Sequence, residues 1–271
     1  MKTPAALLKL RAQIDAIDDI LHDALVARAE IISKVPAVKG KQHLYIRPGR
    51  EAAMMRALLE RDQGKLPPGL IARIWREMIG AFTLTEGGLN VATTDEFWDM
   101  ARDYYGSFTP MIPCASTAKS FEALTKGKAK IAVLPLPENS GRDPWWTKLA
   151  RHPELRIFAR LPFDQRDAKR SNWRGSRKGA LAVARLDPEP TGQDHGLILL
   201  TSKTAISAAA IRAACKKAGT PPVHLFSAKE RKYWLVTAGH LIDKDSSLFN
   251  ALRLVGQVRY VGGYAVPVAL P

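Results

Sequence analysis

The sequence predicts a multidomain chain, with an all-α region of three helices over residues 1–88, an α/β region over 89–187 and a small α+β region over 188–271. Three observations support this prediction. Apolar residues recur at steps of three and four in the first region, which is the period of a helix. Short apolar runs then alternate with amphipathic segments. The last region has strand-like and helical segments in the order βαββαβ.

The longest helix is predicted over residues 5–40, and two of its cations share a face with its apolar stripe. That stripe consists of Leu7, Leu10, Ile14, Ile17, Leu21, Leu25, Ile32 and Val35. Arg28 lies on the stripe, and Lys39, 11 residues later, lies on nearly the same face of the helix. Because an unpaired buried charge is costly, the two cations need an anionic partner, either a protein carboxylate or a bound ligand.

Arg11 adds a geometric constraint, because it lies about 25 Å from Arg28 along a straight helix. One small ligand cannot touch both arginines of the same helix. If both serve one ligand, Arg11 comes from a second copy of the chain, with the two long helices antiparallel. Three helices also bury little apolar surface alone, so the sequence predicts a dimer.

Prolines and glycines delimit the other helices. Pro36 is expected to kink the last turn of the first helix or to end it. A second helix is predicted from about Pro48 to near Gly64, and a third from about Pro68 to Thr85. The buried face expected for the third helix comprises Leu70, Ile71, Ile74, Trp75, Met78, Ile79 and Phe82.

The remaining 183 residues, 89–271, read as alternating strands and helices. In the α/β region a short strand and a helix are followed by a turn at MIPC, a helix, and the strands KIAVLPL, LRIFARLPF and GALAVARL. The α+β region has the strands GLILLTSK, PPVHLFSA, KYWLVTAGHL and RYVGGYAVPVAL, with the helices ISAAAIRAACKKAG and SSLFNALRLVG.

The net charge of +15 is densest in residues 166–178. Nucleic-acid binding is one interpretation. We favour a solvated loop, since Trp173 is its one aromatic residue and no known nucleic-acid module surrounds it. Two cysteines, Cys114 and Cys215, favour a reducing cytoplasm over a disulfide scaffold. The scattered histidines predict no metal cluster, and no apolar run approaches the ~20 residues of a membrane span.

Residues 5–88 resemble an all-helical chorismate mutase. The resemblance lies in LRAQIDAIDDIL, VARAEII, RPGREAAMMRALL and IWREMIGAFTLTE, with Arg11, Arg28, Lys39, Arg50 and Glu51 at the family's spacing. Members of that family are intertwined dimers of three-helix protomers, and each site takes one arginine from the other protomer.

The resemblance implies an isomerase of phenylalanine and tyrosine biosynthesis that rearranges chorismate to prephenate. This reaction needs no cofactor, nucleophile or proton transfer, only a dianion held in a compact conformer with charge stabilised on its ether oxygen. Arg28 and the partner's Arg11 would bind the two carboxylates, and Lys39 would donate to the ether oxygen. Glu51 would accept a hydrogen bond from the ring hydroxyl, and Arg50 would help order the site.

Three positions depart from the family pattern. Glu86 stands where bacterial members often have a glutamine that faces the ether oxygen. An ionised glutamate would repel the developing oxyanion, so Glu86 is expected to act in its protonated form. A polar position one turn earlier reads Phe82 or Thr83, and a family aspartate is replaced by Arg47.

The run SFEALTKGKAKIAVLPLPENSG resembles one lobe of a prephenate dehydratase, through Pro135, Glu138, Asn139 and Ser140. The family's catalytic Thr-Arg-Phe motif is absent, and its place is taken by Lys178, Gly179 and Ala180. A non-catalytic, dehydratase-like domain is therefore predicted for residues 89–187, and the alternative is a generic α/β domain without that ancestry.

Residues 188–271 resemble an ACT-type regulatory domain, but FSAKERK stands in place of the family's effector-binding motif Glu-Ser-Arg-Pro. The predicted function is thus a chorismate mutase with a non-catalytic C-terminal half. One alternative is a bifunctional mutase-dehydratase, which the missing motif disfavours. Another is a non-catalytic regulatory protein, which the retained core cations disfavour.

Overall fold

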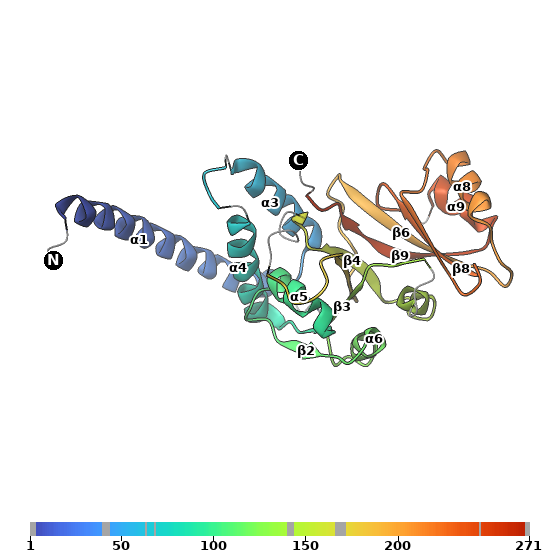
Figure 1. Cartoon of the computed structure of the whole chain (residues 1–271), viewed down its shortest axis with the longest axis horizontal. Coiled ribbons are helices and arrows are strands. Elements are labelled where there is room, and N and C mark those ends of the chain that lie inside the picture. Colours follow the sequence, from blue (N-terminus) through green and yellow to red (C-terminus); the bar gives the residue numbers. More distant parts are fainter. Residues whose placement is uncertain are drawn as a thin grey trace.

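A computed structural model describes residues 4–39, 44–62, 64–67, 69–139, 144–165, 172–243 and 245–268. Figure 1 shows one long helix that extends away from the rest of the chain, with two further helices between it and a long sheet. The helices of the first region are α1 (Ala5–Ser33), α2 (Val35–Lys39), α3 (Pro48–Arg61) and α4 (Leu70–Gly87).

The predicted effect of Pro36 is confirmed, although the break lies two residues before it. A turn at Lys34 separates α1 from α2, so the first helix ends at Ser33 and does not continue to residue 40. Proline has no backbone N–H, and its ring clashes with the carbonyl group four residues earlier, which disfavours a continuous helix here. Pro48 opens α3 as expected, because its missing donor lies where no helical bond forms.

The first helix has almost no cover within one chain. None of its residues is buried, and ten of its large apolar side chains are between 40% and 68% exposed: Leu7, Leu8, Leu10, Ile14, Ile17, Ile20, Leu21, Leu25, Val26 and Ile31. At 1.5 Å per residue, α1 is about 43 Å long, and Figure 1 shows most of that length projecting from the body. An apolar face of this size on one element is typical of a surface that packs against another chain.

The buried face predicted for α4 is wrong for most of its residues. Of the predicted set only Ile71 is buried, and Leu70 and Ile74 are exposed. The face that packs against the rest of the chain has small residues around one arginine: Ala72, Arg76, Gly80 and Thr83. Small side chains allow a neighbouring backbone to approach, and a Cβ added at Gly80 would lie 2.0 Å from the carbonyl oxygen of Tyr105.

The α/β region has its elements in the predicted order. They are β1 (Val91–Thr93), η1 (Asp95–Phe97), α5 (Trp98–Tyr105), β2 (Met111–Pro113), α6 (Thr117–Thr125), β3 (Ile131–Pro135), η2 (Trp145–Arg151), β4 (Arg156–Leu161) and β5 (Ala180–Ala184). One local prediction is wrong, because the predicted turn at MIPC contains β2. This short strand pairs with β1 in parallel, and backbone pairing of that kind has no local sequence signal.

The last region confirms the predicted βαββαβ order. It contains β6 (Asp194–Thr201), α8 (Ala208–Lys217), β7 (His224–Ala228), β8 (Tyr233–Ala238), α9 (Ser247–Arg253) and β9 (Gln257–Ala265). Its four strands lie in the order β9-β6-β8-β7 and are all antiparallel, which is the arrangement of a split βαβ sandwich.

One sheet of nine described strands, in the order β2-β1-β3-β5-β4-β9-β6-β8-β7, crosses the predicted boundary at residues 187 and 188. The two units join where β4 and β9 run parallel, with Ile157 opposite Gly262. Gly262 has a φ of +117°, and a Cβ there would lie 2.1 Å from the carbonyl oxygen of Ile157. Only glycine fits this junction, because it has no side chain and tolerates positive φ.

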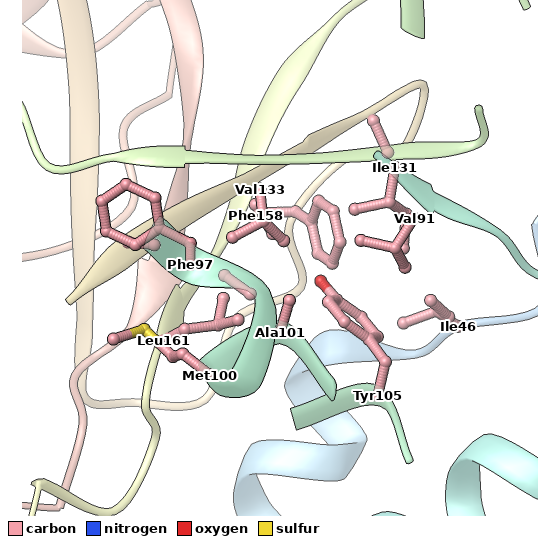
Figure 2. Packing of buried hydrophobic residues seen from close by; sticks show 14 of the residues in the cluster. Ile46, Val91, Phe97, Met100, Ala101, Tyr105, Ile131, Val133, Phe158 and Leu161 are labelled. Atoms are coloured by element: carbon pink, nitrogen blue, oxygen red, sulfur yellow. The ribbon is translucent and has the colours of Figure 1, made fainter. Parts of the chain in front are cut away.

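The helical region also shares a hydrophobic core with the α/β region. Leu44 and Ile46, which precede α3, are buried in the same cluster as Val91, Tyr105 and Ile131. Figure 2 shows Ile46 and Tyr105 facing this cluster together with the strand residues Val91 and Ile131. The start of α3 is therefore anchored in the core of the following region.

Candidate active site

Helices α1, α2, α3 and α4 line an open cavity of about 500 Å³. Its charged lining residues include Arg28 from α1, Arg50 and Glu51 from the first turn of α3, and Glu86 from the last turn of α4. Four of the six predicted site residues thus meet around one space. Apolar side chains such as Ile79 and Phe82 line much of the rest, and they weaken the screening of the charges beside them.

Arg28 has the geometry of an anion-binding residue. Its guanidinium lies over the ring of Phe82, 4.9 Å from the ring centroid, and this packing limits its movement. Its buried Nη1 atom has no hydrogen-bond partner within the described part of the chain. Burial lowers the pKa of Arg28, and the nearby charge of Arg50 lowers it further, while Glu86 opposes both effects. An anion bound in the cavity would compensate this accumulation of positive charge.

Glu51 is held by a residue that the sequence analysis missed. Arg76 of α4 donates through Nη1 to Oε2 of Glu51 at 2.9 Å, and the two side chains are only 6% and 14% exposed. Burial raises the pKa of the Glu51 carboxyl, whereas Arg76 favours its charged form. The sequence feature that could have indicated a buried Arg76 is its spacing of four residues from Ala72 and from Gly80, because small residues on the same helix face as an arginine indicate close packing there.

Phe82 and Thr83, the two residues considered for the polar position, both line the cavity, but neither offers a free hydroxyl. Thr83 donates its hydroxyl hydrogen bond to the carbonyl oxygen of Ile79 at 2.8 Å, within its own helix. Phe82 packs under Arg28. Glu86 is therefore the acidic residue that α4 contributes to the described cavity lining.

Arg47, which stands in place of the family's aspartate, pairs with Glu189 from the segment between β5 and β6. The other carboxylate oxygen of Glu189 accepts a hydrogen bond from the backbone N–H of Arg50 at 3.4 Å. A negative charge at the start of α3 also favours the helix dipole. Residues of the last region thus hold the helix turn that carries Arg50 and Glu51.

Of the two remaining predicted residues, Arg11 is not brought to this cavity by the described chain. Arg11 lies on the projecting part of α1, about 25 Å from Arg28 along the helix axis. Lys39 ends α2, and its side chain lies outside the described residues. The cavity of a single chain therefore contains Arg28 but not Arg11.

Residues 10–87 match the model of the family described as chorismate mutase type II. The helical region is a chorismate mutase type II domain. The matched residues include every residue that lines the cavity described above.

Proteins that combine two activities are similar to this chain. The bifunctional chorismate mutase/prephenate dehydratase of Pseudomonas aeruginosa is 28% identical in an alignment over 144 residues, which covers 49% of this chain and 39% of that protein. The protein of the same name from Aquifex aeolicus is 26% identical over 139 residues, or 48% of this chain and 38% of that protein. The matches span about two fifths of the length of these curated relatives.

A solved structure of prephenate dehydratase from Arthrobacter aurescens, in complex with L-Phe, aligns with a TM-score of 0.49 and 14% identity. The alignment covers 68% of this chain and 93% of the dehydratase chain.

A second cavity of about 340 Å³ lies in the region after the mutase domain. Lys178 and Gly179, which stand in place of the dehydratase motif, line it together with Glu138. Lys178 Nζ lies 3.4 Å from Glu138 Oε1, and both side chains are mostly exposed. Asn139 instead accepts a hydrogen bond from the backbone of Ser227 at 2.9 Å, and Ser140 lies outside the described residues.

The structure describes residues 172–178 of the basic segment 166–178. The one aromatic residue of that segment, Trp173, is buried. Trp173 is 8% exposed and donates through Nε1 to Asp103 Oδ2 at 2.6 Å. A buried indole cannot stack on a base.

Among the described residues, no helix is long and apolar enough to cross a membrane, and no group of histidine, cysteine, aspartate and glutamate side chains is placed to hold a metal.

Proposed function

We propose that this protein is a chorismate mutase that converts chorismate to prephenate as a homodimer with shared active sites. The observation that supports this most directly is the cavity in which Arg28, Arg50, Glu51 and Glu86 meet within a chorismate mutase type II domain. The rearrangement requires a dianion held in a compact conformer, which a rigid cavity with fixed cations supplies.

The proposed roles follow the chemistry of each side chain. Arg28 and the partner's Arg11 bind the two carboxylates, because planar guanidinium groups match carboxylate geometry. Lys39 donates to the ether oxygen as negative charge develops there. Glu51 accepts from the ring hydroxyl, and Arg50 neutralises charge beside it. Glu86, when protonated, donates a second hydrogen bond to the ether oxygen.

The exposed apolar face of α1 supports the dimer. Six of its exposed apolar side chains lie on one stripe, and two copies of α1 packed antiparallel about a two-fold axis would cover them: Leu7, Leu10, Ile14, Ile17, Leu21 and Leu25. Burial of each such side chain contributes roughly 1.5–3 kcal/mol when it is complete, so the gain is large compared with the net stability of a domain. The same packing brings Arg11 of one copy towards the cavity of the other.

We propose further that the region after the mutase domain has no dehydratase activity and that the protein works in the cytoplasm. Lys178 and Gly179 leave the second cavity without the catalytic threonine of the dehydratase family. Both cysteines are free thiols, which fits a reducing compartment.

The test is the consumption of chorismate by the purified protein, followed by identification of the product. We expect prephenate to accumulate and no phenylpyruvate to form at neutral pH above the spontaneous background. Arg28→Ala should lower kcat/KM at least about 100-fold, because it removes a charged donor from a poorly solvated site. Arg73→Ala is the matched control, since Arg73 is an exposed arginine of α4 that pairs with Asp103. Absence of chorismate consumption by the wild-type dimer would overturn the proposal.

A further inference from the structure

The carboxylate of Glu51 lines the proposed active-site cavity, but its partner Arg76 does not. Arg76 reaches it from α4 with a 2.9 Å hydrogen bond to Oε2. Both side chains are almost fully buried, so water does not compete for this contact. A carboxylate in such a place has few alternative orientations, and its partner determines which way its other oxygen points.

Arg76 is in turn held by a residue from outside the mutase domain. Its guanidinium lies 3.8 Å from the ring centroid of Tyr104, which belongs to α5. Its Nη2 atom is buried and has no hydrogen-bond partner within the described part of the chain. Stacking on the tyrosine ring therefore helps to set the plane of the guanidinium.

We propose that Arg76 is a positioning residue for Glu51, and that Tyr104 of the following region holds Arg76 in place. In this arrangement the region that follows the mutase domain forms the back wall of the active site. This inference rests on the proposed mutase activity, but it assigns roles to two residues that do not touch the substrate.

Loss of Arg76 should change the pH dependence of the reaction as well as its rate. Burial raises the pKa of Glu51, and Arg76 counteracts this by favouring the charged form. Without Arg76, Glu51 would take up a proton at higher pH and accept less well from the substrate hydroxyl. Among the described residues, the other charged or titratable groups that face Glu51 or share its cavity are Arg28, Lys34, Tyr45, Arg47, Arg50, Glu86, Tyr104, Tyr105 and Glu189. None of them replaces the direct ion pair.

The experiment compares kcat, KM and the pH profile of Arg76→Met with those of the wild type and of Arg73→Met. Arg73 lies on the same helix but pairs with the partly exposed Asp103 at 3.6 Å and does not line the mutase cavity. We expect Arg76→Met to lower kcat at least about tenfold and to move the acid limb of kcat/KM upward by about one to three pH units. Arg73→Met should leave both unchanged.

A second comparison separates positioning from simple loss of fold. The double variant Glu51→Gln/Arg76→Met lacks the buried carboxylate that Arg76→Met leaves unpaired, so it should remain folded even if the single variant does not. If Arg76 acts through Glu51, the double variant has the same kcat as Glu51→Gln. Tyr104→Phe keeps the ring under Arg76 and should stay within about threefold of wild type, whereas Tyr104→Leu should resemble Arg76→Met.

The results distinguish this inference from the proposed function. An inactive wild type would contradict the mutase proposal itself. An active wild type with an unchanged pH profile in Arg76→Met, or a further loss of kcat when Arg76→Met is added to Glu51→Gln, would overturn the positioning role while the mutase proposal stands.

Discussion

Mixed dimers offer the sharpest test of the shared active site. The perturbation is a pair of single variants, Arg11→Ala and Arg28→Ala, each of which removes one carboxylate-binding group. About 25 Å of helix separates the two positions, so one chain cannot place both at one substrate. Each homodimer should therefore be nearly inactive, because every site lacks either Arg11 or Arg28.

The expected recovery follows from two-fold symmetry. When the two variants exchange subunits at equal concentration, half of the dimers are mixed. In a mixed dimer one site has both arginines intact and the other lacks both. Activity should therefore rise to about a quarter of the wild-type value at equal total protein. The assay is chorismate consumption before and after subunit exchange, with exchange verified by a mass tag on one variant.

A matched mixture checks the same geometry in the opposite direction. When wild type is mixed with the double variant Arg11→Ala/Arg28→Ala, every site of a mixed dimer lacks one arginine. Activity should then fall from half of the wild-type value to about a quarter as exchange proceeds. If Arg11 and Arg28 of the same chain formed the site, this mixture would stay at half, and the single variants would show no recovery. That pair of results would refute the trans arrangement.

Three further predictions follow from the structure. Glu86→Gln keeps a hydrogen-bond donor at every pH, so it should flatten a wild-type rate that falls towards alkaline pH and should raise activity there; a wild-type profile that is already flat would contradict the role of Glu86. Gly80→Ala should lower the free energy of unfolding by about 2 kcal/mol and Tm by about 4–8 °C, because the new Cβ would lie 2.0 Å from the carbonyl oxygen of Tyr105. At an exposed helix position alanine is more favourable than glycine by about 1 kcal/mol, so the control variant Ala57→Gly should lower the free energy of unfolding by only that amount. A Gly80→Ala variant that is more stable than the wild type would refute the close packing of α4 on α5. Cys215 is buried and burial raises the pKa of its thiol, so a thiol reagent should label the partly exposed Cys114 first; equal labelling rates in the folded protein would contradict the burial of Cys215.

Much of this protein could be predicted from its sequence, because the signals are local. The helical period, Pro36 and Pro48 predicted the elements of the mutase domain to within a few residues. The resemblance to the chorismate mutase family predicted that Arg28, Arg50, Glu51 and Glu86 serve one site, and the four residues do line one cavity. The βαββαβ order of the last region also followed from apolar runs and turns. The helices and the strand order depend on the chain within a few residues of the position concerned.

The tertiary structure decided what depends on residues distant in sequence. The pairing of Glu51 with Arg76 and of Arg76 with Tyr104 joins three helices, and no local pattern specifies which carboxylate a buried arginine meets. The large apolar face of α4 looked like the buried one, yet the small residues around Gly80 pack against α5, because small side chains permit close backbone approach. The joining of two predicted regions into one sheet likewise rests on Gly262, which lets β9 approach β4. Hydrophobic periodicity shows which residues avoid water, but only packing between distant segments determines what each of them contacts.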